Sequence, residues 1–210
     1  MNPSTTLLHL DVSPRGSRSR SRTLGRDFLA AWRPAHPQGR VVTRDLGHEP
    51  PPFVTEPWVE GAFAPPDSHS PAARAAIAVS DRYVDELLAA DQLVITTPMY
   101  NLSLPAALKA WIDQIVRVGR TFGMGAAGFE GLVRGKRAYV LVSSGSDFRP
   151  GTPGSAYNFL EPYLRAVLGF IGITDVKFIY AHSQNQADTL GAEAYATARA
   201  EAEALARATA

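Results

Sequence analysis

The sequence predicts a doubly wound α/β fold, in which helices cover both faces of a parallel β-sheet. Five short apolar runs alternate along the chain with longer segments whose apolar residues recur at helical spacing. The runs are almost continuously apolar, which is typical of parallel strands that are buried on both faces. The chain has 210 residues, 45% of them hydrophobic, so we expect a single domain that covers residues 1–210.

The expected strands and helices follow one another in a regular order. The strands cover residues 5–13, 40–46, 91–100, 135–146 and 175–183. Helices are expected to begin at Ser21 and near Ser70, to cover residues 105–118 and 155–170, and to begin again near Gln186. Residues 48–70 are rich in proline and have no regular period, so a long loop is expected there.

Right-handed crossovers between five such strands give the strand order 2-1-3-4-5 of a flavodoxin-like sheet. Ligands of these sheets bind beyond the carboxyl ends of the strands, at the point where the direction of winding changes. The loops after the first, third and fourth strands meet at that point. Those three loops therefore form the candidate binding site.

The composition excludes several other classes of protein. The net charge of +1 gives no overall positive field for binding nucleic acid. No run reaches the roughly 18 consecutive apolar residues of a membrane span, and the N-terminal residues lack the basic region of a secretory signal, so a cytoplasmic location is expected. The chain has no cysteine, and its five histidines lack metal-ligand spacing. We therefore expect no metal site, and any redox chemistry requires an organic cofactor.

The first loop belongs to the stretch "SPRGSRSRSRTL", residues 13–24, between the first strand and the first helix. Ser13 ends the strand, and Ser19, Arg20 and Ser21 lie where the helix begins. A helix N-terminus attracts phosphate, and serine hydroxyls donate to phosphate oxygens. Two alternatives remain at this point: Ser19 or Ser21 is simply an N-cap, or the arginines form an RNA-binding Arg/Ser tract.

The second loop contains Met99, Tyr100, Asn101 and Leu102, after Pro98 ends the third strand. A non-helical turn at this point presents main-chain N–H groups and the Asn101 amide to the rim of a flat ring. Met99 or Tyr100 is then placed to cover a face of that ring. The alternative is an ordinary strand–helix connection whose methionine and tyrosine pack in the core.

The third loop consists of Ser143, Ser144, Gly145 and Ser146. Small side chains allow close approach, and their hydroxyl and N–H groups suit the edge of a pyrimidine ring, although such turns follow many strands for structural reasons alone. The agreement of three loops at one edge of the sheet favours a shared ligand.

Residues 123–128, "GMGAAG", match the glycine spacing of a dinucleotide-binding loop. That loop must follow a strand and open a helix, whereas this segment follows a helix and leads into the fourth strand. We therefore do not expect it to bind a pyrophosphate.

Several of these segments together resemble the FMN-dependent NAD(P)H azoreductases, which also reduce quinones. The matching segments are S-x-S-x-x-L after the first strand, "PMYN" and "PAALKAWID" after the third, "FEGLVRGK" before the fourth, and "LGFIGITDVKFIYA". The resemblance covers nearly the whole chain. It implies a flavodoxin-like homodimer with one FMN in each subunit.

Carried across by position, the resemblance places the FMN phosphate on Ser13 and residues 19–21. It places the flavin ring against residues 99–102 and the pyrimidine edge near residues 143–146. NADH or NADPH is then the electron donor, and a small aromatic acceptor, a quinone or an azo compound, is reduced in a ping-pong reaction. The resemblance assigns no side chain as acid, base or nucleophile, because the flavin carries the chemistry.

The sequence departs from the family pattern at three places. Leu102 stands where the family often has phenylalanine, and residues 143–146 replace a common Ser-Arg-Gly-Gly. Gly123 and Met124 stand where relatives often have an aromatic residue, in a loop that faces the substrate. Two other function classes remain compatible with this fold: an FMN electron carrier without substrate turnover, and an interaction protein with an empty site.

Overall fold

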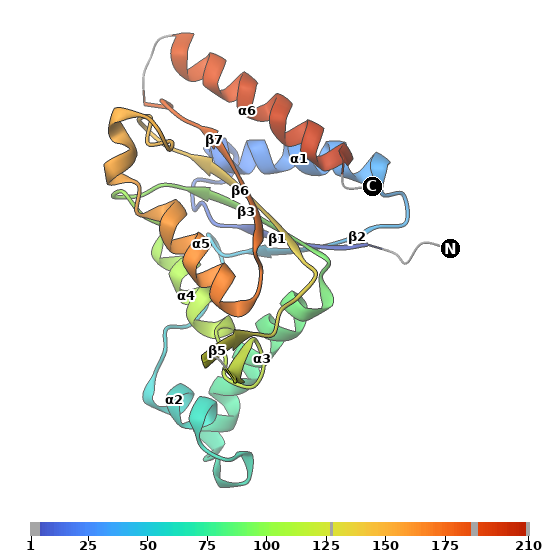
Figure 1. Ribbon diagram of the computed structural model, residues 1–210, viewed down its shortest axis with the longest axis vertical. Helices are drawn as coiled ribbons and strands as arrows, with labels where there is room; N and C mark the ends of the chain where they lie inside the picture. The colour runs from blue at the N-terminus through green and yellow to red at the C-terminus, as the bar shows by residue number, and fades with distance from the viewer. Residues whose placement is uncertain (1–4, 127, 186–188, 209–210) are drawn as a thin grey trace.

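The computed structural model describes residues 5–126, 128–185 and 189–208, and Figure 1 shows their arrangement. A five-stranded parallel sheet lies at the centre, with the strand order β2-β1-β3-β6-β7. Its strands are β1 (Thr6–Asp11), β2 (Arg40–Asp45), β3 (Gln92–Pro98), β6 (Arg137–Ser143) and β7 (Asp175–Ala181). Because β6 and β7 are the fourth and fifth strands of this sheet along the chain, the predicted order 2-1-3-4-5 is confirmed.

Helices cover both faces of the sheet (Figure 1). One face carries α1 (Arg20–Ala35) and α6 (Thr189–Ala208), and the other carries α3 (Pro71–Ala89), α4 (Ala106–Ile115) and α5 (Leu160–Ile171). The packing of α1 follows from its sequence. Leu24, Phe28 and Trp32 recur every four residues, lie on one side of the helix and are fully buried.

Each face of the sheet has its own apolar core. Leu7 and Val94 pack with α1 and α6 on one face, whereas Leu8 and Ile95 belong to the core beneath α3, α4 and α5. Consecutive strand residues point to opposite faces, so a strand that is covered on both sides is apolar at most of its positions. This is why the central strands are continuous apolar runs in the sequence.

The strand register brings the functional edge of the sheet together. Asp11 of β1 is paired with Thr96 of β3, and Pro98 of β3 is paired with Ser143 of β6. Neighbouring strands lie about 4.8 Å apart. The loops that follow β1, β3 and β6 therefore leave the sheet side by side.

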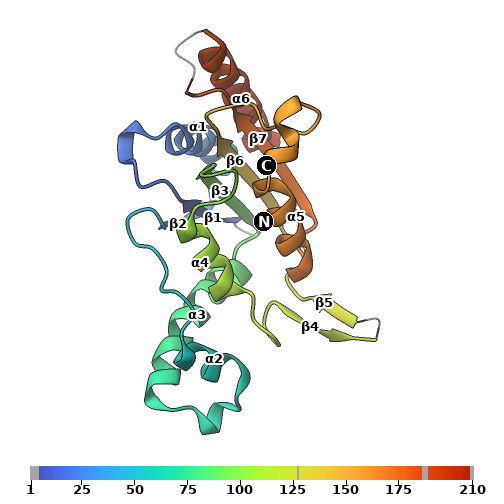
Figure 2. The same cartoon turned by 90° about the vertical axis from the view of Figure 1, so that its left-hand side faces the viewer.

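Residues 48–70 contain a helix, so the prediction of a loop throughout this segment was wrong. Helix α2 (Glu56–Phe63) is followed by a short 3-10 helix (Pro66–Ser68), and the segment projects from the body of the molecule (Figure 2). Trp58 anchors α2, because its ring is buried and its Nε1 donates to Oε1 of Gln114 at 2.8 Å. The carboxylate of Glu60 also accepts hydrogen bonds from the N–H and the hydroxyl of Ser70, so the contacts that hold α2 are specific and form no repeating apolar pattern in the sequence.

A two-stranded hairpin follows α4 and precedes β6 in the chain. Strands β4 (Phe122–Gly125) and β5 (Gly128–Gly131) pair antiparallel and project from the sheet (Figure 2). They contain the segment 123–128, of which residue 127 lies outside the described residues. This glycine-rich segment joins two strands and opens no helix, which agrees with its rejection as a dinucleotide-binding loop.

The last two helices differ slightly from the expected boundaries. A 3-10 helix over Pro153–Tyr157 precedes α5, which begins only at Leu160. Oδ1 of Asn158 accepts hydrogen bonds from the N–H groups of Leu160 and Glu161, and this fixes the start of α5. The expected start of the last helix near Gln186 lies outside the described residues.

Within the part of the chain that is described, no helix has both the length and the apolar character needed to cross a membrane.

Candidate functional site

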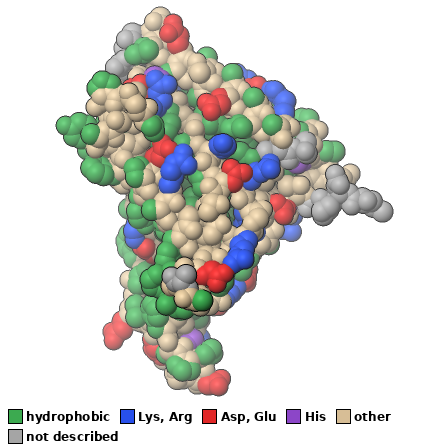
Figure 3. Space-filling view, in the orientation of Figure 1, with side chains coloured by type: hydrophobic (Ala, Val, Ile, Leu, Met, Phe, Trp, Pro, Cys, Tyr) green, Lys and Arg blue, Asp and Glu red, His purple; other side chains and the backbone are tan. Residues whose placement is uncertain are grey.

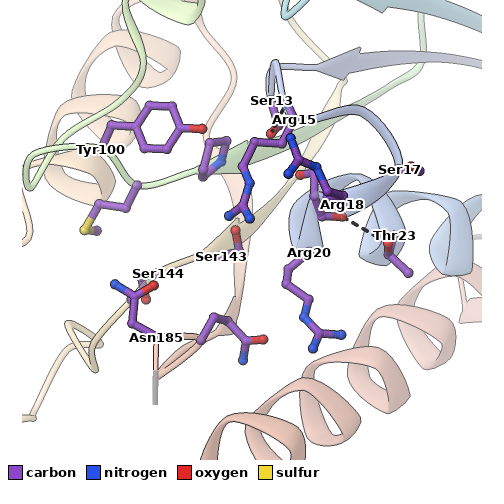
Figure 4. A pocket seen from close by; sticks show the side chains of 15 residues that line it. Ser13, Arg15, Ser17, Arg18, Arg20, Thr23, Tyr100, Ser143, Ser144 and Asn185 are labelled. Atoms are coloured by element: carbon purple, nitrogen blue, oxygen red, sulfur yellow. Dashed lines mark hydrogen bonds between the residues drawn. The ribbon is translucent and has the colours of Figure 1, made fainter. Parts of the chain in front are cut away.

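A cavity of about 580 Å³ opens at the carboxyl edge of the sheet. Pockets for small molecules and cofactors are typically about 300–1,000 Å³ in volume. The walls come from the loops after β1, β3, β6 and β7 (Figure 4). The lining residues are Ser13, Arg15, Ser17, Arg18, Ser19, Arg20, Thr23, Pro98, Met99, Tyr100, Ser143, Ser144, Gly145, Gln184 and Asn185.

The start of α1 forms the first wall. Ser19 is the N-cap of α1, and its Oγ accepts a hydrogen bond from the N–H of Arg22 at 3.3 Å. Ser19 also lines the cavity, so capping the helix and facing a ligand are compatible roles for this residue. The N–H of Arg20 is among those at the start of a helix that have no acceptor within it. This wall therefore presents donors to an anionic group.

The turn after β3 forms the second wall. Tyr100 and Ser103 exchange two main-chain hydrogen bonds of 3.0 Å around a turn in which Asn101 and Leu102 have φ angles of 47° and 71°. Positive φ at both central positions is typical of a type I′ turn, and it costs energy for a residue such as leucine. The carbonyl oxygen of Leu102 accepts a hydrogen bond from the N–H of Phe159, which holds the turn in place. This wall is a preformed non-helical turn.

The loops after β6 and β7 form the remaining walls and are joined to each other. The N–H of Gln184 donates to the carbonyl oxygen of Ser144 at 3.0 Å, and the N–H of Asn185 donates to that of Gly145 at 3.3 Å. A Cβ atom at Gly145 would lie 2.3 Å from Nδ2 of Asn185. Glycine is therefore required at position 145 if Asn185 is to keep its place beside the cavity.

Most of the residues predicted from the sequence meet at this cavity. Those that line it are Ser13, Ser19, Arg20, Met99, Tyr100, Ser143, Ser144 and Gly145. Ser21, Asn101, Leu102 and Ser146 do not line it. The Ser21 side chain is fully buried beside Ser19, and Asn101 and Leu102 occupy the turn next to the wall. The carbonyl oxygen of Ser146 accepts a hydrogen bond from Oγ of Ser144 at 2.8 Å. Ser146 therefore stabilises the loop after β6 without lining the cavity.

The charged residues that line the cavity are all basic. Arg15, Arg18 and Arg20 lie on one side, and the described lining residues include no carboxylate (Figure 4). The guanidinium of Arg20 lies 5.5 Å from the ring centroid of Tyr195 in α6, which directs this side chain along the α6 side of the opening. An anionic ligand is therefore favoured over a cationic one.

Arg22 lies behind the first wall and is largely buried. Its Nε donates to the carbonyl oxygen of Ser13 at 2.6 Å, and its Nη1 donates to Oδ2 of Asp11 at 3.0 Å. Both Nη atoms bond to the carboxylate of Asp45, at 2.8 and 2.5 Å, and Nη2 lies 3.0 Å from Nδ1 of His48. One guanidinium thus connects the ends of β1 and β2 to the cavity wall.

The pKa values of the groups around Arg22 are shifted in different directions. Hydrogen bonds from Arg22 lower the pKa of Asp45 to about 2, whereas burial raises the pKa of Asp11 to about 6 against the opposing charge of Arg22. Burial, with a further contribution from Arg22, lowers the pKa of His9 to about 4. His9 is therefore neutral at pH 7, and its Nε2 lies 3.1 Å from Oγ1 of Thr96.

Comparison with known proteins agrees with this architecture. A family model described as a flavodoxin-like fold matches residues 5–206. The chain belongs to this flavodoxin-like family. The match extends over the central sheet, its helices and all four loops that line the cavity.

Similar members of the flavodoxin-like family include named oxidoreductases. The FMN-dependent NADH:quinone oxidoreductase of Nostoc punctiforme is 53% identical over 182 residues, which are 87% of this chain and 89% of that protein. The FMN-dependent NAD(P)H:quinone oxidoreductase 1 of Pseudomonas aeruginosa is 50% identical over 184 residues, which are 85% and 87% of the two chains. Among solved structures, the azoreductase from Bacillus anthracis superposes with a TM-score of 0.90 at 29% identity, covering 97% of this chain and 99% of that chain.

Sequence reasoning missed the contributions of the last loop and of three arginines, Arg15, Arg18 and Arg22. Gln184 and Asn185 follow β7, whose carboxyl end lies at the same edge of the sheet as the ends of β3 and β6. That shared edge was the available signal, but the expected site was restricted to three loops. For Arg22, the signal was an aspartate at the end of each of the first two strands, Asp11 and Asp45, which the register places side by side.

Proposed function

We propose that this protein is an FMN-dependent oxidoreductase that transfers electrons from NADH or NADPH to quinones or aromatic azo compounds. The observation that carries the proposal is the convergence of loops from β1, β3 and β6 on one basic cavity of about 580 Å³. The relatives that are about 50% identical over most of the chain carry the same activity in their names, and this supports the assignment.

The residues present fit the phosphate of FMN. Ser13, Ser17 and Ser19 supply hydroxyl groups, the start of α1 supplies main-chain N–H groups, and Arg15 and Arg18 supply positive charge. Each of these features favours a dianionic phosphate. The proposed phosphate position is therefore the end of the cavity that is formed by residues 13–20, with Ser21 acting through its contact with Ser19.

The opposite part of the cavity fits a flat ring. Met99 and Tyr100 line it on the β3 side, and Ser143, Ser144 and Gly145 line it on the β6 side. Asn101 and Leu102 hold the adjoining turn, in which no acceptor for their N–H groups is found among the described residues. We propose that residues 99–102 lie along the flavin ring and that residues 143–146 approach its pyrimidine edge.

When bound, FMN supplies the redox chemistry, taking a hydride from the nicotinamide and passing electrons to the acceptor. The protein binds and orients: its fixed main-chain N–H groups stabilise negative charge on the ring without having to reorganise. No side chain is assigned as an acid, base or nucleophile. Donor and acceptor use the same opening in turn, which gives ping-pong kinetics.

We further propose a cytoplasmic homodimer in which a second copy covers part of the exposed apolar surface. Hydrophobic side chains gather along one side of the molecule in Figure 3. Among all the described residues, the large hydrophobic side chains with the highest exposure are Phe53, Phe63, Met124, Phe129, Tyr157 and Phe159, each 57–72% accessible. Such a surface is typical of an interaction face. The electron donor NAD(P)H is available in the cytoplasm.

The proposal is tested with purified protein, free FMN, NADH and a benzoquinone. We expect the protein to bind FMN and to catalyse continuous quinone-dependent oxidation of NADH. Flavin binding without turnover would instead indicate an electron carrier, and failure to bind FMN would indicate an interaction protein.

The phosphate position is tested at Ser17, which is exposed and lines the cavity. Ser17→Glu places a carboxylate beside the proposed phosphate, and like charges should raise the Kd for FMN by at least about tenfold. Ser17→Gln, of similar size but neutral, is the matched control. Equal affinities for the two variants would contradict the phosphate position.

A further inference from the structure

The carbonyl oxygen of Ser13 has two close neighbours at the point where the cavity wall leaves β1. Nε of Arg22 donates to it at 2.6 Å. Gly47 lies so near that a Cβ atom placed on it would be only 2.4 Å from this oxygen. The Arg22 hydrogen bond therefore fixes the Ser13 carbonyl, and position 47 has no room for a side chain beside it. Ser13 itself lines the cavity.

Arg22 is itself fixed by partners from three different segments. Asp45 at the end of β2 binds it in a two-pronged arrangement, and Asp11 at the end of β1 binds its Nη1. Nδ1 of His48, one residue beyond Gly47, lies 3.0 Å from Nη2 of Arg22 and 2.8 Å from Oδ2 of Asp45, and it accepts from the guanidinium in one tautomer or donates to the carboxylate in the other. A planar guanidinium satisfies these acceptors simultaneously, whereas a lysine ammonium does not.

The loop after β2 completes this arrangement. The N–H of Gly47 donates to the carbonyl oxygen of Asp11 at 3.2 Å, so the loop crosses directly over the end of β1. Nη2 of Arg22 would lie 2.9 Å from a Cβ on Gly47. Any side chain at position 47 must therefore displace Ser13, Arg22 or the loop.

We propose that Arg22 and Gly47 together act as positioning residues that set the orientation of the Ser13 peptide, and with it the first wall of the flavin site. Neither residue lines the cavity, and both act through Ser13. This inference rests on the proposed function, because the ligand whose binding it controls is FMN. It assigns a role to the segment after β2 in forming a site built by the loops of other strands.

A competing explanation is that Arg22 acts only through its positive charge, which would attract the phosphate at a distance. The two explanations differ for substitutions that preserve charge. Arg22→Lys keeps the charge but loses the planar geometry, and Gly47→Ala changes no charge at all. If Arg22 and Gly47 act by orienting the Ser13 peptide, both variants should bind FMN more weakly. If Arg22 acts only through its charge, neither variant should.

The experiment measures the Kd for FMN by titration of the flavin-free protein, together with kcat at saturating FMN and the thermal midpoint of unfolding. We expect the Kd to rise by about tenfold in Arg22→Lys and in Gly47→Ala, equivalent to about 1.4 kcal/mol. We expect kcat at saturating FMN to stay within about twofold of the unsubstituted enzyme, because the bound ring keeps its own contacts.

Two matched controls come from the same chain. Arg33→Lys changes an exposed arginine in the last turn of α1, and Gly169→Ala changes a glycine of α5 that has no atom within 4 Å of the added Cβ. Both controls should bind FMN like the unsubstituted protein.

The possible results separate the explanations. An unchanged Kd in Gly47→Ala would overturn the proposal, whatever Arg22→Lys does. A lower thermal midpoint with an unchanged Kd in both variants would reduce Arg22 and Gly47 to purely structural roles and would also overturn it. If the unsubstituted protein itself binds no FMN, the proposed function fails, and that outcome is seen before any variant is compared.

Discussion

His9 should make the protein less stable in mild acid. The imidazole lies within the sheet on β1, is 4% exposed, and its Nδ1 has no hydrogen-bond partner among the described residues. Burial lowers its pKa from 6.5 to about 4. Below pH 6.5 the unfolded chain binds a proton at this position and the folded chain does not, so the free energy of unfolding falls as the pH falls.

The size of the effect follows from the two pKa values. The full difference between 6.5 and about 4 corresponds to about 3 kcal/mol, and about 2 kcal/mol of it is lost between pH 7 and pH 5. Asp11 has the opposite effect, because burial raises its pKa from 3.8 to about 6. Its contribution to the free energy of unfolding falls as the pH rises through that range. The measured quantity must therefore be a difference between proteins that both retain Asp11.

The assay is urea unfolding at pH 5, 6 and 7, at a fixed FMN concentration, for the unsubstituted protein, His9→Gln and His9→Leu. Both variants remove the titrating group, and His9→Gln keeps a polar atom for Thr96. We expect the unsubstituted protein to lose about 2 kcal/mol more than either variant between pH 7 and pH 5. Parallel pH dependences for all three proteins would refute the reasoning.

Two further predictions concern stability elsewhere in the fold. Ser70→Ala removes the N-cap of α3, where Oγ of Ser70 accepts from the N–H of Ala73 at 3.1 Å, and urea unfolding should show a loss of about 1 kcal/mol. Gly131→Ala should cost about 1–3 kcal/mol in the same assay, because the new Cβ would lie 2.3 Å from the main-chain nitrogen of Gly172. An unfolding midpoint equal to that of the unsubstituted protein would contradict either prediction.

The central sheet could be predicted from the sequence because its signal is local and repeated. Each inner strand is a continuous apolar run, and the polar or proline-rich loops between elements separate these runs clearly. The flanking helices carry apolar residues at the spacing seen at Leu24, Phe28 and Trp32. Strand order then followed from the handedness of the crossovers, without any knowledge of particular contacts.

The parts that could not be predicted depend on contacts between distant residues. Helix α2 is held by Trp58 against Gln114, which is 56 residues away in the sequence. Half of the residues in β4 and β5 are glycines, and strands of four residues are too short for an alternating pattern to be recognised. The contact of Gly145 with Asn185 is likewise invisible until the loops after β6 and β7 are placed side by side.

In the candidate site too, features with a local sequence signal could be predicted, whereas features that depend on contacts between distant residues could not. Ser13, Ser19, Met99 and Ser143 were predicted because they lie at the ends of recognisable strands or helices. The positive φ angle of Leu102 was not, because leucine has no preference for that conformation and the surrounding hydrogen bonds impose it.

The common edge shared by β1, β3 and β6 has a consequence for how the cavity opens. Its walls are continuous with neighbouring strands of one hydrogen-bonded layer, so they have no hinge between them and are not borne on separate bodies. Separating the walls means pulling apart the middle of the molecule. A ligand that contacts several of these walls therefore also ties the central strands to one another, and saturating ligand should raise the temperature at which the whole chain unfolds.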